Sequence, residues 1–403
     1  MRRSPTNMES TESRLRALRE IAVVVDGHSD ILLPVASFGV DLTTRWEVPG
    51  EGDWRLPAAL EERMGAGEVG LSARSAFFGN LGQYDLPRWR VGGVAAQLCA
   101  VYIENRHLGS AFARGMELVR CFHEVVGSNA GFVHATSTAD IRRAKKEGRV
   151  ALVLSFEGCE ALGPDVRMVD LYYRLGLRVA SLTHIRRNDF ADGCWAAENQ
   201  GGLTGTGKAL VRRMEELGIV VDLAHIGEAG YWEILGLVTR PVVLSHSTPT
   251  MFPSSDPNAR VVPGGILPRP RLEPSRDRER LEALRANGGV LGIIWATHAS
   301  LEAVVDDIET AIEIIGPDHV GLGSDLCGPD LAPSGLEDIS RTWALAEALV
   351  IRGHSDETIL KFMGENYLRV FDASWSVRER GGQDSLGCES VSYAFSRATN
   401  EAR

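Results

Sequence analysis

Short apolar segments recur along the chain, separated by longer segments in which apolar residues repeat every three to four positions. Eight of the apolar segments have the length and composition of buried β-strands. They lie at 23–25, 94–101, 151–154, 178–182, 219–223, 242–244, 289–294 and 320–323. The periodic segments predict helices over 111–126, 165–175, 206–217, 278–286 and 301–315. Strands that alternate with helices in this way predict an α/β protein with a (β/α)8 barrel, the TIM-barrel architecture.

The same pattern predicts how the chain is divided. Two further helices, over 336–352 and 355–371, follow the eighth strand and are expected to cap or flank the barrel. We expect a single catalytic barrel domain over 19–373, between a flexible N-terminal segment over 1–18 and a polar C-terminal tail over 374–403.

The residues that follow the strands carry the candidate chemistry. Five of the eight strands lead into residues of the types that bind metal ions, namely His28 and Asp30, Glu157, His225, His246 and Asp325. Ionisable side chains at the C-terminal ends of parallel strands are the usual plan of a barrel active site. Burying them without partners would cost several kcal/mol each, whereas a cation compensates them. The sequence therefore predicts a metal site at this rim.

The types and the number of these candidate ligands indicate two metal ions. His28 and Asp30 are two positions apart in an extended segment, so both can face one metal, although such a pair alone is weak evidence. With Glu157, His225 and His246 they form five ligands without a thiolate, which suits Zn²⁺ or Mn²⁺. One catalytic zinc usually keeps about three protein ligands and an open position. A carboxylate that bridges two metals accounts for the number, and such centres serve hydrolysis.

Two residues of the same rim are not required as ligands. His184 follows the fourth strand and Asp325 follows the eighth, so both are predicted to act on the substrate. The stretch 202–208 nearly matches a phosphate-binding loop. However, Ala209 replaces the hydroxyl residue that would hold Mg²⁺, and no buried strand precedes the stretch. We therefore expect no nucleotide site there.

Composition narrows the class of protein further. The formal charge of −11 argues against nucleic acid as a partner, because phosphate contacts need clustered Lys and Arg. The six cysteines form no C-x-x-C pair, which favours a reduced, cytosolic setting. The N-terminal residues lack the apolar core of a signal peptide, and no segment approaches the ~20 apolar residues that cross a bilayer. We expect a cytoplasmic protein without a membrane partner.

Taken together, six motifs resemble those of the membrane (renal) dipeptidases, peptidase family M19. They occur in the order seen in that family, as Asp-Gly-His-Ser-Asp at 26–30, Phe-Glu-Gly at 156–158, Leu-Thr-His at 182–184, Asp-Leu-Ala-His at 222–225, Ser-His-Ser at 245–247 and Gly-Leu-Gly-Ser-Asp at 321–325. The resemblance covers about residues 20–372, which is nearly the whole predicted domain.

The resemblance implies a binuclear zinc barrel of the metal-dependent amidohydrolase type, often a homodimer, that hydrolyses dipeptides. It implies that His28 and Asp30 bind one zinc, that His225 and His246 bind the other, and that Glu157 bridges both. A hydroxide held between the metals would attack the peptide carbonyl. The resemblance further implies that His184 polarises this carbonyl or stabilises the developing oxyanion. Asp325 would take the proton of the nucleophile and pass it to the leaving amine.

The chain departs from the family pattern at three places. Ser29 stands where Asn is usual, at a position that is not a ligand, and Cys327 stands where many members have Asp. The family also uses an Arg after the sixth strand to hold the substrate carboxylate, a role that suits a planar bidentate donor. Here that loop, over 251–276, is longer and rich in Pro, Arg and Gly. Arg260 is the first choice for this role, with Arg269 and Arg271 as alternatives.

Other functions stay open at this point. The same metal centre could hydrolyse another small amide, such as a Cys-Gly conjugate, a dehydropeptide or a β-lactam. A mononuclear metal barrel with a different reaction, such as a deaminase or lactonase, would bind close to one metal per chain instead of two. A catalytically silent relative with a binding or scaffold role would be expected to have lost ligands, and this chain retains them all.

Overall fold

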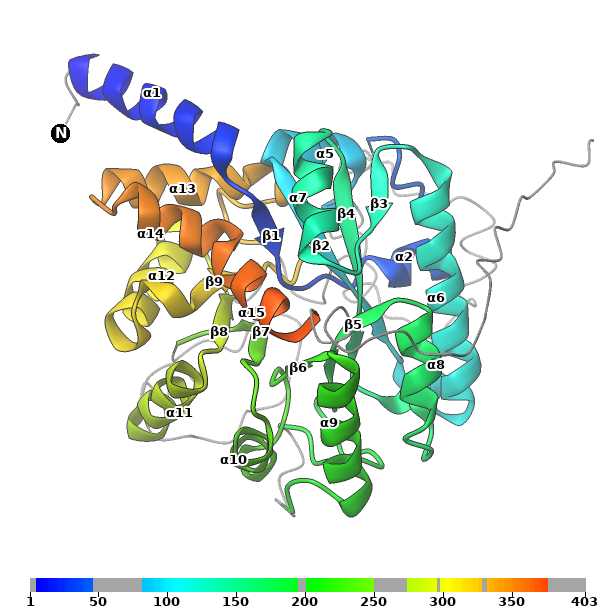
Figure 1. Ribbon diagram of the computed structural model, residues 1–403. Coiled ribbons are helices and arrows are strands. Elements are labelled where there is room, and N and C mark those ends of the chain that lie inside the picture. Colours follow the sequence, from blue (N-terminus) through cyan, green and yellow to red (C-terminus); the bar gives the residue numbers. More distant parts are fainter. Residues whose placement is uncertain are drawn as a thin grey trace, which may run out of the picture.

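The strands of the protein form one parallel sheet that closes into a barrel (Figure 1). The computed structural model describes residues 5–45, 82–194, 201–249, 274–295, 298–327 and 332–375. The strands in this part are β1 (Val24–Asp26), β2 (Val94–Tyr102), β3 (Phe132–His134), β4 (Val150–Glu157), β5 (Leu177–Ser181), β6 (Val220–Asp222), β7 (Val243–Ser247), β8 (Val290–Ile293) and β9 (Val320–Leu322). Pairing of β2 with β4 and of β9 with β1 closes an eight-stranded barrel. The predicted (β/α)8 barrel is confirmed.

The strand β3 is the one strand of the described chain that the sequence pattern did not predict. It pairs with the first residues of β4, with Phe132 opposite Val150, on the edge of β4 that β5 occupies further along. The barrel strand β2 pairs with the other edge of β4. The apolar run at β3 is only Phe132 and Val133, between Gly131 and His134, whereas the other three-residue strands lie in longer apolar runs, so the sequence pattern did not reveal it.

Helices surround the barrel, as Figure 1 shows. In the described part they are α1 (Pro5–Ile21), α2 (Leu32–Phe38), α5 (Leu86–Gly92), α6 (Ala111–Ser128), α7 (Thr138–Lys146), α8 (Met168–Arg174), α9 (Gly205–Leu217), α10 (Glu228–Leu237), α11 (Pro274–Asn287), α12 (Leu301–Ile315), α13 (Thr342–Ile351), α14 (Asp356–Leu360) and α15 (Asn366–Trp375). The five helices predicted between the strands are present, with ends shifted by a few residues. No helix in these ranges is long and apolar enough to cross a membrane.

The glycine-rich stretch at 202–208 leads into the helix α9. The Thr204 side chain accepts a hydrogen bond from the Gly207 backbone and caps the helix. A Cβ atom on Gly207 would lie 2.0 Å from the Phe190 carbonyl oxygen, so helix packing requires glycine at this position. Leu203, before this helix, forms an isolated antiparallel bridge with Ala191.

Residues 5–18, expected to be flexible, belong to α1, which lies against α13 (Figure 1). Leu18 is buried, and Arg14 Nη2 donates a hydrogen bond to the His354 carbonyl at 2.6 Å. The Arg19 guanidinium lies 5.1 Å from the centre of the Trp343 ring. These contacts fasten the helix to the domain, while the domain boundaries at 18/19 and 373/374 stay a prediction.

The C-terminal helices close the N-terminal end of the barrel, as predicted. The helix expected over 355–371 is divided by a π-helical turn, Lys361–Glu365, where a Cβ on Gly364 would lie 2.0 Å from the Val23 carbonyl oxygen. Beyond it, the buried Tyr367 side chain enters the barrel and donates a hydrogen bond to the Ser245 carbonyl at 3.0 Å. A Cβ on Gly292 would lie 2.3 Å from the Tyr367 hydroxyl, so a glycine in β8 makes room for this ring.

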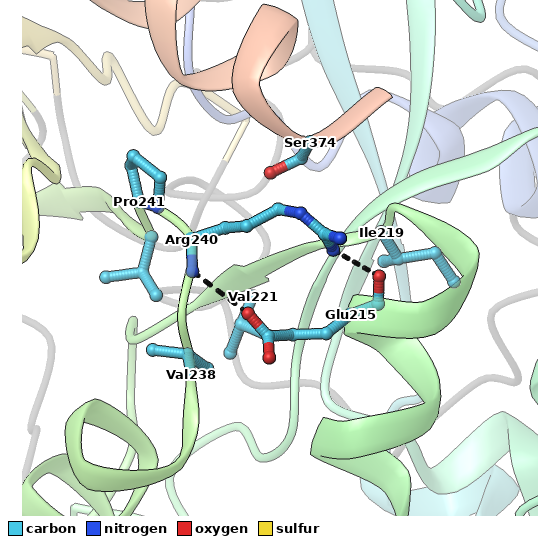
Figure 2. A pocket seen from close by; sticks show the side chains of 8 residues that line it. Glu215, Ile219, Val221, Val238, Arg240, Pro241 and Ser374 are labelled. Atoms are coloured by element: carbon cyan, nitrogen blue, oxygen red, sulfur yellow. Dashed lines mark hydrogen bonds between the residues drawn. The ribbon is translucent and has the colours of Figure 1, made fainter. Parts of the chain in front are cut away.

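A small hollow at this same end is shown in Figure 2. It is lined by Glu215, Ile219, Val221, Val238, Arg240, Pro241, Val242 and Ser374. The Arg240 guanidinium donates to the Glu215 carbonyl, and the Arg240 backbone donates to the Glu215 carboxylate at 3.0 Å. Because these groups satisfy one another at the N-terminal ends of β6 and β7, the hollow is a structural joint remote from the opposite rim.

Candidate metal centre

Every predicted metal ligand lies at the C-terminal rim of the barrel, around the carboxylate of Glu157. Glu157 is the last residue of β4, and His28, His184 and His225 follow β1, β5 and β6 within three residues. Its Oε1 atom lies 2.8 Å from His225 Nε2, 3.6 Å from His246 Nε2, 3.7 Å from His28 Nε2 and 3.8 Å from His184 Nε2. Four imidazoles from four strands therefore converge on one carboxylate oxygen.

The ligand atoms fall into three groups, each with all atoms within 4.8 Å of one another. The groups are His28 with Glu157 and His246, Glu157 with His184 and His225, and His28 with Asp30 and Asp325. Glu157 and His28 each belong to two of these groups. His184 and Asp325, which the sequence predicts to act on the substrate, are in contact with the same cluster.

The donor atoms of this cluster fit divalent cations. His28 Nε2 and Asp30 Oδ1 are buried and have no hydrogen-bond partner among the described residues. The Nε2 atoms of His225 and His246 face one another at 2.8 Å. Buried polar atoms without partners are uncommon in folded proteins. A cation supplies the missing partner to imidazole and carboxylate lone pairs together, so the residues present fit a metal.

Burial shifts the pKa values of the cluster so that the neutral forms of its side chains are favoured. It raises the pKa of Glu157 to about 8 and that of Asp30 well above its usual range, in the latter case helped by the charge of Glu157. Burial also lowers the pKa of His28 to about 3 and that of His184 to about 2, and the neighbouring His225 adds to both shifts. Neutral imidazoles are the form that binds metals, and a bound cation favours ionised carboxylates.

Two buried carboxylates brace the strand ends that carry the ligands. Asp26 accepts hydrogen bonds from the Ser324 backbone at 2.8 Å and from the Ser324 hydroxyl at 2.5 Å, and so ties the end of β1 to the residue before Asp325. Asp222 accepts from the backbones of Ala224 and Ser245, both at 3.0 Å, and so joins the end of β6 to β7. Both aspartates belong to the motifs recognised in the sequence, but no role was predicted for them. Their position two or three residues before a predicted ligand was the available signal.

The backbone is strained at the same rim. Three residues other than glycine have positive φ in the described chain, His225 at 61°, Asp325 at 53° and Cys327 at 65°. Left-handed backbone costs such residues of order 1 kcal/mol or more, and it persists where the surroundings fix it. Two of the three are predicted site residues, so the strain serves to direct their side chains.

Of the remaining residues singled out in the sequence, the structure describes Cys327 but not the three arginines. Arg260, Arg269 and Arg271 lie outside the described residues, so their role in holding a carboxylate stays a prediction. Cys327 is half-buried, and its backbone donates to Gln83 Oε1 at 2.7 Å. Burial raises the pKa of its thiol well above the usual range, and the charges of Asp30 and Asp325 add to this shift, which places the thiol beside the cluster.

Two further residues beside the cluster, Tyr102 and Arg186, were not predicted from the sequence. Tyr102 ends β2 opposite Glu157, and its ring centre lies 4.6 Å from that of His184. Arg186 follows His184 by two residues, and its positive charge contributes to the lowered pKa of His184 after burial and His225. The strand β2 ends in no metal-type residue, so its end drew no attention in the sequence.

Comparison with known proteins agrees with this geometry. Residues 12–383 match the sequence model of the membrane dipeptidase family, peptidase family M19. Dipeptidase aclJ of Aspergillus oryzae is 33% identical over 309 residues, which cover 72% of this chain and 69% of the relative. Dipeptidase verJ of Clonostachys rogersoniana is 32% identical over 322 residues, covering 74% of this chain and 78% of the relative.

Solved structures share the fold. A metallopeptidase from Rhodobacter sphaeroides, bound to a phosphinate mimic of L-Ala-D-Ala, superposes with a TM-score of 0.69 at 23% identity and covers 88% of this chain and 99% of its own. The probable dipeptidase PvdM from Pseudomonas aeruginosa gives 0.70 at 20% identity, with 92% and 99% covered. The family match spans nearly the whole chain, and the chain therefore belongs to the membrane dipeptidase family, peptidase family M19, and is a peptidase of the hydrolase class.

Proposed function

We propose that this protein is a zinc-dependent dipeptidase that hydrolyses the peptide bond of dipeptides at a binuclear centre. The observation that carries the proposal is the convergence of four imidazole nitrogens on Glu157 Oε1 within 3.8 Å. A single carboxylate among that many imidazoles is suited to bridge two cations. Membership of the M19 family supports a dipeptide as the substrate.

The ligands divide into two sets in this proposal. His28 and Asp30 would hold one zinc, His225 and His246 would hold the other, and Glu157 would contribute to both. Zinc held there would supply a Lewis acid for the carbonyl oxygen and would lower the pKa of its bound water towards neutrality. The buried carboxylates Asp26 and Asp222 keep these ligands in place through the hydrogen bonds that they accept across strand ends.

Two residues act on the substrate in the proposed mechanism. His184 places its imidazole against the carbonyl oxygen and stabilises the charge that develops there. Its side chain is 20% exposed, so it can reach a bound substrate. Asp325, with 16% of its side chain exposed, takes the proton of the attacking water and delivers it to the leaving amine nitrogen. Its Oδ1 atom lies 3.5 Å from His28 Nε2, which places it beside the reacting groups.

One observation favours a second substrate class. Cys327, beside Asp30 and Asp325, stands where the family resemblance leads us to expect an aspartate, so the site has one negative charge less than that pattern implies. The same centre would then act on another small amide, such as a Cys-Gly conjugate, a dehydropeptide or a β-lactam.

The test is hydrolysis of L-L, L-D and Cys-Gly dipeptides by zinc-loaded protein, with the metal content measured on the same sample. Two zinc ions per chain, with turnover that a chelator abolishes, is the expected result. Two zinc ions without dipeptide turnover would move the proposal to the second substrate class. Close to one zinc per chain would contradict the binuclear centre and favour a mononuclear one.

A homodimer and a cytoplasmic location are further parts of the proposal that rest on the sequence and on the family resemblance. Light scattering of the purified protein measures the oligomeric state directly, and a molecular mass near 43.8 kDa, that of one chain, would contradict the dimer.

A further inference from the structure

Two neighbouring polar side chains, Gln83 and Tyr84, are buried against the loop that carries Asp325. They lie in the turn just before α5 and are 3% and 2% exposed. Buried polar side chains normally have hydrogen-bond partners, and the partners of these two lie on either side of Asp325, after β9. The proposed mechanism assigns no role to this turn.

The side chain of Tyr84 fastens the residue before Asp325. Its hydroxyl lies 2.6 Å from Ser324 Oγ, and both hydroxyls lie within 3.2 Å of Asp26 Oδ2. The Tyr84 hydroxyl also lies 3.4 Å from the His28 carbonyl oxygen. Because three polar side chains are in mutual contact there, the backbone of Ser324 is held against the end of β1.

The side chain of Gln83 fastens the loop beyond Asp325. The Cys327 backbone donates to Gln83 Oε1 at 2.7 Å. In addition, the Ile339 backbone donates to the Gln83 carbonyl at 3.1 Å, at the start of the 3-10 helix η4 (Ile339–Arg341). Gln83 therefore ties the loop after β9 to a second, separate segment of the chain.

The turn itself is fixed by the residues that follow it. The Asp85 side chain accepts a hydrogen bond from the Arg88 backbone at 2.8 Å and caps α5. The buried Arg88 guanidinium contacts the Asp85 carboxylate and donates to Asp338 Oδ2 at 3.0 Å. A Cβ on Gly92 would lie 2.2 Å from the Ile339 carbonyl oxygen, so α5 packs directly on η4. Gln83 and Tyr84 thus project from a rigid support.

Asp325 lies between the two fastened positions and has a strained backbone. Its φ of 53° costs of order 1 kcal/mol or more and persists only where the surroundings fix it. Its Oδ1 atom lies 3.5 Å from His28 Nε2. Proton transfer requires this carboxylate within hydrogen-bond reach of the reacting atoms, and a displacement of about 1 Å can lower a rate roughly 100-fold.

We propose that Gln83 and Tyr84 are positioning residues that hold Asp325 in its left-handed conformation and so direct its carboxylate towards the reacting groups. The inference rests on the proposed dipeptidase function, in which Asp325 moves the proton. It adds to that function a turn that is far from the rim residues in the sequence. Both side chains act through the backbone on either side of Asp325 and not on the substrate.

The test is a mutant cycle with Asp325→Asn, measured as kcat for alanyl-alanine with zinc-loaded protein. Gln83→Met and Tyr84→Phe remove the polar atoms with little change of volume. Each should lower kcat roughly 3- to 10-fold, the value of one hydrogen bond, with KM and zinc content unchanged. Asp325→Asn alone should lower kcat roughly 100-fold or more. In that background, the same two substitutions should change the remaining kcat less than about twofold, because no proton-transferring carboxylate is left to position.

Tyr231→Phe is the matched control. Tyr231 is also 2% exposed, and its hydroxyl donates to the Arg280 carbonyl at 2.8 Å, away from the loop after β9. The control loses one buried hydrogen bond, so its Tm should fall about as much as that of Tyr84→Phe. Its kcat should stay unchanged, which separates positioning from general stability.

Amide hydrogen exchange of the metal-free protein gives a second measurement that does not depend on catalysis. Gln83→Met removes the acceptor of the Cys327 amide, so a peptide that covers 323–327 should exchange roughly 10-fold faster than in the parent. A peptide that covers β8 should exchange as before. Thermal unfolding of each variant checks that the fold is intact.

Three results would overturn the inference. Equal fold losses of kcat in the parent and in Asp325→Asn would mean that Gln83 and Tyr84 support the site as a whole. Unchanged kcat and unchanged exchange in Gln83→Met would mean that the loop holds Asp325 without them. Both results leave dipeptide turnover by the parent intact. Failure of the zinc-loaded parent to hydrolyse alanyl-alanine would instead remove the dipeptidase proposal, and the positioning role with it.

Discussion

Glu157 differs from every other side chain of the rim because four imidazoles share one of its oxygens within 3.8 Å. Loss of one histidine would leave the other ligands of each ion in place. Loss of the Glu157 charge would remove an anion from both ion positions at once, in a site where the carboxylate is 4% exposed. At the scale of single residues, the binuclear proposal therefore depends most on Glu157.

The substitution Glu157→Gln tests this role. We expect the variant to retain the fold, to bind one zinc less per chain and to lose roughly 1000-fold in kcat/KM, since a metal acting as Lewis acid supplies several kcal/mol to the transition state. Metal analysis and turnover on one sample measure both effects. Glu160→Gln, three residues beyond Glu157 and also largely buried, is the control and should keep full metal content. Full metal content in Glu157→Gln would contradict the bridging role.

At the scale of elements, β3 shows how a short strand outside the barrel adds a pH-sensitive contact. Its last residue, His134, packs against Phe122 and His123, with ring centres 5.1 Å and 5.3 Å away. A Cβ on Gly176 would lie 2.1 Å from the His134 ring, so the imidazole fills the space beside this glycine. Burial lowers the pKa of His134 to about 4, with a further contribution from the charge of His123.

This shift predicts a loss of stability in acid. Because the folded-state pKa of His134 is lower than its usual value of 6.5, the unfolded chain binds the proton more readily. The stability that neutral His134 contributes to the folded protein is fully present above pH 6.5 and is lost as the pH falls towards 4. Between pH 6.5 and pH 4 the free energy of unfolding of the parent protein should therefore fall by about 2 to 3 kcal/mol more than that of His134→Gln. Urea unfolding at pH 7 and pH 4 measures the difference, and parallel losses in both proteins would contradict the assignment.

The helix α15 closes the barrel through one side chain. Tyr367 is fully buried, and its hydroxyl bonds the Ser245 carbonyl just before His246. Tyr367→Phe should cost about 1 kcal/mol, the net value of one hydrogen bond, whereas Tyr367→Ala should cost about 3 to 5 kcal/mol through the cavity that it leaves. Denaturant unfolding gives both numbers. Similar costs for the two variants would mean that the hydrogen bond, and not the ring, holds the helix in the barrel.

At the scale of the whole molecule, the sequence predicts the features that repeat. Eight apolar strands and the ligands that follow them were visible because buried parallel strands are continuous apolar runs and a barrel gathers its chemistry at one rim. The features that do not repeat were not visible. Arg186 is one charged residue in a polar loop. The apolar run at β3 is too short to show the pattern of a buried strand. The left-handed backbone of His225 depends on its tertiary surroundings. Asp26 lies between these two cases. Its motif was recognised in the sequence, but its hydrogen bond to Ser324 could be found only in the folded structure.

Removal of metal should affect the stability of the whole barrel, since the ligands come from strands distributed around it. A metal that binds only the folded chain adds stability in proportion to the logarithm of its concentration over Kd, typically about 3 to 4 kcal/mol at a hundred- to thousandfold excess. We therefore expect a chelator to lower the Tm of the zinc-loaded protein by several degrees. Re-addition of zinc should restore it, and Glu157→Gln should show a smaller shift. Tyr367→Phe, at the far end of the barrel, should have a lower Tm but the same response to chelator. A Tm that does not change with metal would contradict a centre that joins the strands.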